Sequence, residues 1–159
     1  MAATRLTARE PAVRGGPSAV PARAFVVDAS VSAAWVLPDE ATAFTAAALQ
    51  ATAAGEVWVP VLWGLEMTNL LQSAQRRRRI GAAKRAELAA GLAALRLQVC
   101  REPVALVTLD ALAAEHGLTA YDACYLELAL RRRLPLATLD ADLLAAMQRC
   151  GVARAELGT

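Results

Sequence analysis

Short runs of apolar, β-branched residues alternate along this chain with segments of helical periodicity, and this alternation most constrains the fold. The runs are AFVV at 24–27, EVWVP at 56–60, LQV at 97–99 and LPLAT at 134–138. Each has the composition of a short buried strand. Strands that alternate with helices are typical of α/β domains, because a crossover helix carries the chain back to start the next parallel strand. We therefore expect an α/β sandwich with a mainly parallel central sheet.

Helical segments lie between and after these runs, and their ends carry residues that start or stop helices. Pro38 ends the first segment, Gly117 ends the fifth, and Pro60 is expected in the first turn of the third. Thr119, followed three residues later by Asp122, has the form of a capping box at the start of the sixth. The expected helices span about 29–37, 40–53, 61–75, 82–95, 103–115, 120–133 and 142–150.

The length of 159 residues indicates one domain, with residues 1–22 outside it. These first residues are rich in Ala, Arg, Pro and Gly, and they lack both apolar periodicity and the apolar centre of a secretory signal. We expect a flexible leader followed by a domain at 23–159. Although 57% of the residues are hydrophobic, no apolar run reaches the roughly 18 residues that a membrane-spanning helix requires.

Cysteine, histidine and lysine usage excludes several classes of site. Cys100, Cys124 and Cys150 form no CxxC pair, and their odd number argues against a disulfide framework and for a reducing cytoplasm. The single histidine, His116, argues against zinc binding and against a Ser-His-Asp hydrolase. The single lysine, Lys84, lies in no Gly-rich phosphate loop.

Arginines gather at two predicted helix ends. The net charge is +2, and the two clusters are Arg76, Arg77, Arg78 and Arg79, and Arg131, Arg132 and Arg133. Positive side chains at a helix C-terminus complement the helix dipole whatever the function. They also suit contacts with RNA phosphates. Both interpretations stay open.

Four acidic residues occupy positions from which they could meet at one edge of the sheet. Asp28 and Asp140 each follow a predicted strand, Glu66 lies on a helix after the second strand, and Asp122 lies in the first turn of another helix. In open parallel sheets, groups beyond the carboxyl ends of the strands gather in the crevice where the strand order reverses. The sequence therefore predicts an acidic cluster there.

Each acid also has an ordinary structural interpretation. Asp122 suits a helix cap, Asp140 and Asp142 flank a strand-to-helix turn, and Glu66 suits a solvated helix position. Asp28 is the hardest to explain in this way, because it directly follows a strand that we expect to be buried.

Convergence of these acids would require a counter-charge. Two carboxylates ~4 Å apart repel by about 4 kcal/mol at an effective dielectric of 20. Oxygen ligands alone favour Mg²⁺ or Mn²⁺, and the nearby Asn69, Ser30 and Thr138 supply neutral oxygens. Such a site can activate water and stabilise a leaving oxyanion, so we expect phosphodiester hydrolysis by a metal-activated water that a carboxylate orients.

Three stretches of the chain resemble PIN-domain ribonucleases, and among them the VapC-type toxins of bacterial toxin–antitoxin systems. VVDASVSAAWVLPDE is similar to the opening motif of the family, with Asp28 as its first acid and Ser30 beside it. VPVLWGLEMTNLL is similar to the second, with Glu66 and Asn69. LTAYDACYLELALRRRLPLATLDADL resembles the third and fourth, with Asp122 and Asp140 as acids and Thr138 and Asp142 as neighbours. The resemblance runs from about Phe25 to Val152.

This resemblance implies a three-layer α/β/α fold and a Mg²⁺- or Mn²⁺-dependent endoribonuclease. It also implies a homodimer and a cognate antitoxin that inhibits it. The four acids would be the catalytic and metal-binding residues. The leader departs from the family, which usually begins almost at the first strand. A start codon assigned too far upstream would explain the difference, and a genuine tail is the alternative.

Two further functional classes stay open. One is a catalytically silent PIN-like module that binds RNA or an antitoxin-like peptide, although the presence of all four acids argues against it. The other is a phosphoryl-transfer domain, either a phosphatase of the haloacid dehalogenase type or a receiver. The stretch DASVS lacks the second aspartate that the phosphatase places two residues after the first, and the receiver lacks a suitably placed lysine.

Overall fold

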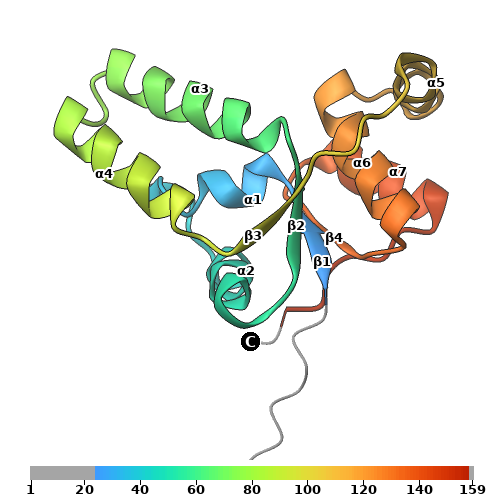
Figure 1. The fold of residues 1–159 in the computed structure, drawn as a ribbon, viewed down its shortest axis with the longest axis horizontal. Helices are drawn as coiled ribbons and strands as arrows, with labels where there is room; N and C mark the ends of the chain where they lie inside the picture. The colour runs from blue at the N-terminus through green and yellow to red at the C-terminus, as the bar shows by residue number, and fades with distance from the viewer. Residues whose placement is uncertain (1–23, 158–159) are drawn as a thin grey trace, which may run out of the picture.

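The structure, a computed structural model, describes residues 24–157 and has a parallel sheet at its centre (Figure 1). The leader predicted at 1–22 lies outside the described residues. The strands are β1 (Phe25–Val27), β2 (Val57–Pro60), β3 (Leu97–Cys100) and β4 (Leu136–Ala137). All of these strands pair in parallel, in the order β3-β2-β1-β4. The predicted parallel α/β sheet is confirmed.

The strand order reverses beside β1. The chain passes from β1 to β2 and then to β3 on one side, whereas β4 pairs with the other side of β1. Val26 of β1 is opposite Trp58 of β2 and also opposite Leu136 of β4. The carboxyl ends of β1 and β4 are therefore the topological switch point, where open α/β sheets bind their ligands. Asp28 is the first residue after β1 and stands at this point.

Helices cover both faces of the sheet (Figure 1). One layer holds α1 (Ala29–Ala33), α2 (Ala43–Ala54), α3 (Trp63–Arg76) and α4 (Ala82–Ala93). The other holds α5 (Leu106–His116), α6 (Ala120–Arg132) and α7 (Ala141–Cys150). Within the second layer, α6 packs against β1, β2 and β4. None of the helices in 24–157 is both long and apolar enough to span a membrane.

Two hydrophobic cores account for these layers. Phe25 and Val27 of β1 join one buried cluster with residues of α1 to α4, whereas Val26 joins another with Tyr125 of α6 and Leu143 of α7. Alternate residues of a strand point to opposite faces of its sheet. Because both faces of β1 are apolar, each must be covered by helices, and the three-layer α/β/α sandwich follows.

Several predicted helix boundaries are wrong: α1 ends at Ala33 rather than near residue 37, and α5 begins at Leu106 rather than near residue 103. Two others are wrong for identifiable local reasons. Helix α2 begins at Ala43 rather than near residue 40, because Thr42 and Thr45 form a reciprocal capping box. The preceding Pro38–Glu40 is instead a short 3₁₀ turn. Pro60 is the last residue of β2, opposite Cys100, and α3 begins only at Trp63. The missing N–H of this proline falls where the strand ends.

Residues in the left-handed conformation end three of the helices. Gly117 ends α5 with φ 66° and Gly151 ends α7 with φ 70°, and Gly117 was predicted as such a stop. Helix α6 ends in the same way at Arg133, with φ 55°. A side chain at this φ is strained, whereas glycine is not. Arg133 therefore carries a local conformational cost.

We predict that Arg133→Gly stabilises the protein by about 1 kcal/mol, because glycine removes the strain of the left-handed conformation. For a domain of this size, that corresponds to a rise of about 2–4 °C in the melting temperature. Thermal denaturation followed by circular dichroism measures the change. Gly151→Ala is the matched control and should lower the melting temperature. An unchanged or lower value for Arg133→Gly would contradict the prediction.

Candidate functional site

Asp28 is a buried carboxylate held by hydroxyl groups from two elements. The residue is 3% exposed. Its Oδ2 accepts hydrogen bonds from Ser30 Oγ at 2.5 Å and from Thr138 Oγ1 at 2.8 Å. Burial raises the pKa of the Asp28 carboxyl, and the hydrogen bonds from Ser30 and Thr138 oppose that shift. Asp28 is therefore a partly desolvated acid, fixed between α1 and the end of β4.

The same two hydroxyls extend this network to Asp140. Thr138 Oγ1 accepts from the Asp140 backbone N–H at 3.0 Å, and Ser30 Oγ accepts from the Leu139 N–H at 3.0 Å. Asp140 Oδ1 in turn accepts from the Leu143 N–H at 2.8 Å and caps α7. One oxygen of Asp140 thus has the ordinary capping role that its position in the sequence suggested.

Glu66 lies on α3 and contacts the opposite helical layer. Its Oε2 accepts from the Tyr125 hydroxyl of α6 at 2.5 Å. Burial is the largest cause that raises the pKa of Glu66; the charges of Asp28 and Asp122 raise it further, and the Tyr125 bond lowers it. The negative charges of Asp28 and Asp122 therefore repel the charge of Glu66.

Asp122 lies in the first turn of α6 and is bonded to the residue that caps the helix. Thr119 Oγ1 accepts from the Asp122 N–H at 3.2 Å, so the predicted N-cap is confirmed. The Asp122 carboxylate accepts from the Thr119 hydroxyl at 2.6 Å. One threonine therefore caps the helix and also fixes the orientation of the acid.

The four predicted acids are linked indirectly, and each is held by its own hydrogen bonds. Asp28 and Asp122 both act on the charge of Glu66, and Thr138 links Asp28 to Asp140. Within 24–157, no group of three or more His, Cys, Asp and Glu side chains lies close enough to hold a metal ion as the side chains stand. The donors are oxygens only and repel one another, which is the chemistry that a hard divalent cation relieves. The chemistry of these donors, rather than their present spacing, is what suits a hard divalent cation.

The neighbouring polar residues divide into two groups. Ser30 and Thr138 contact Asp28 directly, whereas Asn69 on α3 and Asp142 on α7 are exposed. Sequence reasoning missed Tyr125, although its place three residues after Asp122 puts both side chains on one face of α6. This spacing of three residues could have identified Tyr125 as a neighbour of the acidic site.

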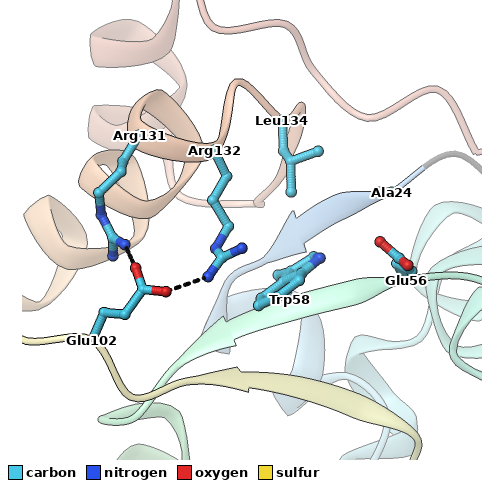
Figure 2. A pocket seen from close by; sticks show the side chains of 7 residues that line it. All are labelled: Ala24, Glu56, Trp58, Glu102, Arg131, Arg132 and Leu134. Carbon is cyan, nitrogen blue, oxygen red and sulfur yellow. Dashed lines mark hydrogen bonds and ion pairs between the residues drawn. The ribbon is translucent and has the colours of Figure 1, made fainter.

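The arginines at the end of α6 belong to a different part of the molecule. Arg132 stacks on Trp58 of β2, with its guanidinium carbon 3.7 Å from the ring centroid. Arg131 and Arg132 both pair with Glu102, and Arg131 also pairs with Glu127. Figure 2 shows both guanidiniums turned toward Glu102. These side chains border a cavity of about 430 Å³. The lining residues are Ala24, Glu56, Trp58, Glu102, Arg131, Arg132 and Leu134.

The arginines at the end of α3 are more exposed. Arg79 pairs with Asp39 at 3.4 Å, and Arg76 donates to Ser73 at 2.9 Å. Arg77 and Arg78 are exposed, and Arg78 has φ 57°. Of the two predicted clusters, this one presents its charge to solvent, whereas Arg131 and Arg132 are largely neutralised within the fold.

The fold and the site define a parallel α/β/α domain with acidic side chains at its switch point. The chain belongs to the PIN domain family, because the family model "PIN domain" matches residues 25–148. PIN domains are in general metal-dependent nucleases. The chain is also similar to the solved structure "Crystal Structure of PAE2754 from Pyrobaculum aerophilum". The identity is 27% over 79% of this chain and 85% of that chain, with a TM-score of 0.59. No curated protein matches the chain.

We predict that, in metal-free protein kept so by a chelator, Asp28→Asn is more stable than the wild type and that this difference in stability grows as the pH rises. Burial raises the pKa of Asp28 in the folded protein above its ordinary value of 3.8. Above pH ~4 the unfolded chain therefore releases its proton first, and folding stability falls until the folded carboxyl has also ionised. Asparagine avoids this loss and keeps an oxygen to accept from Ser30 and Thr138.

Melting temperatures of both proteins, measured with chelator between pH 4 and pH 8, test this prediction. The difference should be smallest at pH 4 and should then grow in favour of Asp28→Asn. Asp110→Asn on the exposed face of α5 is the control, with no such trend expected. A difference that does not depend on pH would show that burial of the charge is not the cause.

Proposed function

We propose that this protein is a metal-dependent endoribonuclease that hydrolyses RNA phosphodiester bonds and acts as the toxin of a toxin–antitoxin pair. The observation that carries the proposal is the buried Asp28 at the switch point of a PIN domain, together with Glu66, whose pKa is raised by burial and raised further by the charges of Asp28 and Asp122. Such mutual repulsion is tolerable when a divalent cation is bound.

The proposed catalytic and metal-binding residues are Asp28, Glu66, Asp122 and Asp140, and the proposed metal is Mg²⁺ or Mn²⁺. When bound, the metal supplies charge stabilisation for the phosphate and lowers the pKa of water. The chain itself would orient the carboxylates through Ser30, Thr138 and Thr119. The proton acceptor would be a carboxylate, because His116 contacts Cys150 and Arg149 instead.

The proposed partners are an RNA substrate, a cognate antitoxin protein and a second copy of the chain, within the cytoplasm. Exposed apolar side chains beside the acids support a protein partner. Val61 and Leu65 precede Glu66 and are 60% and 69% exposed, and Tyr121 precedes Asp122 and is 62% exposed. Apolar exposure of this kind marks interaction surfaces.

The second candidate function is a catalytically silent PIN-like module that binds RNA or an antitoxin. It is favoured by one observation: in 24–157 the carboxylates hold separate hydrogen bonds rather than a ready metal cluster. Calorimetric titration with Mn²⁺ separates the two functions. A silent module would show no metal binding that depends on Asp28.

We predict that the protein cleaves RNA with Mg²⁺, that chelation abolishes cleavage, and that Asp122→Asn lowers the rate by about 100-fold or more. The reason is that this substitution removes one of the negative charges that would bind the metal. Gel analysis of RNA fragments measures the rate. Asp110→Asn, which alters an exposed acid on α5, should cleave like the wild type. Cleavage that persists both with chelator and in Asp122→Asn would refute the proposed function.

We propose that the seven arginines of the two clusters contact RNA to different extents: Arg77 contributes exposed charge, whereas Arg132, which is paired within the fold, chiefly stabilises the domain. Arg77→Ala should weaken RNA binding and lower the slope of log affinity against log salt by about 1, with the melting temperature unchanged. Arg132→Ala should lower the melting temperature, because it removes the stack on Trp58 and the pair with Glu102. Filter binding at several salt concentrations and thermal denaturation measure these effects. Equal effects of both variants on stability would contradict the distinction.

A further inference from the structure

At the acids, the Tyr125 hydroxyl of α6 and the Glu66 carboxylate of α3 form a hydrogen bond between the two helical layers. Tyr125 lies on α6 and is fully buried, with 0% of the residue exposed. Its hydroxyl donates to Glu66 Oε2 on α3 at 2.5 Å, across the end of the sheet. The two layers, which the sheet otherwise separates, are thus joined at the acids.

The ring of Tyr125 is held rigidly by its surroundings. It belongs to the buried cluster that contains Val26, Leu126, Leu136 and Leu143. A close-packed core leaves a side chain in one conformation, so the hydroxyl has a fixed position. Asp122 lies three residues earlier on the same face of α6. One helix therefore presents an acid and a hydrogen-bond donor to the same region.

Glu66 needs such a donor for two reasons. Its side chain is only half-buried on α3, and a long flexible side chain loses rotamer freedom when it is fixed. Its charge is also repelled by Asp28 and Asp122. A tyrosine hydroxyl, protonated at neutral pH, donates to an ionised carboxylate at the short distances that charge-assisted bonds show. The bond from Tyr125 opposes both rotation of Glu66 toward solvent and its neutralisation.

We propose that Tyr125 is a positioning residue of the acidic site, whose hydroxyl anchors one oxygen of Glu66 and leaves the other oxygen available to a divalent cation. The inference rests on the proposed function and deepens it, because it assigns a role to a residue outside the four acids. Donors that orient a metal-binding carboxylate tune the affinity of the site for its metal.

Tyr125→Phe tests this role, because it removes the hydroxyl and keeps the buried ring. The dissociation constant for Mn²⁺, measured by calorimetry on the full chain, should rise by about 10-fold or more. Tyr121→Phe is the matched control: it removes the same hydroxyl from the same helix at a residue that is 62% exposed. Its Mn²⁺ affinity should equal that of the wild type. An unchanged affinity in Tyr125→Phe would overturn the proposal.

A double-mutant cycle separates positioning from a general structural effect. In the Glu66→Gln background, Tyr125→Phe should cause little further loss of Mn²⁺ affinity, because the anchored charge is already absent. An equal loss in both backgrounds would overturn the proposal. At limiting Mn²⁺, Tyr125→Phe should have a higher KM for RNA than the wild type, and saturating Mn²⁺ should restore the wild-type KM. A general distortion of the fold would leave the KM raised at saturating Mn²⁺ and would overturn the proposal.

A measurement on the unsubstituted hydroxyl covers the case in which Tyr125→Phe does not fold. The Tyr125 hydroxyl proton should give a downfield magnetic resonance signal that moves during Mg²⁺ titration and is missing in Glu66→Gln. A signal whose chemical shift does not change during the Mg²⁺ titration would overturn the proposal. Wild-type protein that binds Mn²⁺ and cleaves no RNA would refute the proposed function alone. Wild-type protein that binds no Mn²⁺ would refute both.

Discussion

The hydrogen bonds that Ser30 and Thr138 donate to Asp28 are the interaction on which the rest of the site depends. They join the first residue after β1 to the end of β4, the two strands between which the sheet reverses its order. The same hydroxyls accept from the backbone before α7. A carboxylate buried without such donors would be strongly unfavourable. These bonds therefore stabilise the charge and also fix the start of the helices on either side.

Glu66 and Asp122 carry like charges, and each carboxylate accepts a hydrogen bond from its own donor. Thr119 bonds to Asp122, and Tyr125 bonds to Glu66. Charges brought close together in this way reduce the stability of a metal-free protein. Proteins commonly accept that cost at functional sites. The arrangement is consistent with the PIN family, whose members in general act on nucleic acid with a metal.

The two ends of helix α6 carry charged side chains with different roles. Its first two turns carry Asp122 and Tyr125 toward the acids, whereas its last turn carries Arg131 and Arg132, about 14 Å from Asp122 along the axis. There the positive charges are used within the fold, by Trp58 and Glu102 (Figure 2). Position along one helix thus decides whether a charged side chain serves the acidic site or the packing of the layers.

The sequence by itself determined the local features: the strands, the stop at Gly117 and the cap at Thr119, because each depends on neighbouring residues. It also singled out Asp28 as an acid directly after a buried strand, although the structure shows that Asp28 caps α1 as well. Its errors at Pro60 and at the start of α2 came from competing local signals. Only the tertiary structure decided which acidic side chains repel one another. It also decided that the Tyr125 hydroxyl donates a hydrogen bond to Glu66. Those contacts depend on the strand order and on packing between residues far apart in the chain, which no local pattern encodes.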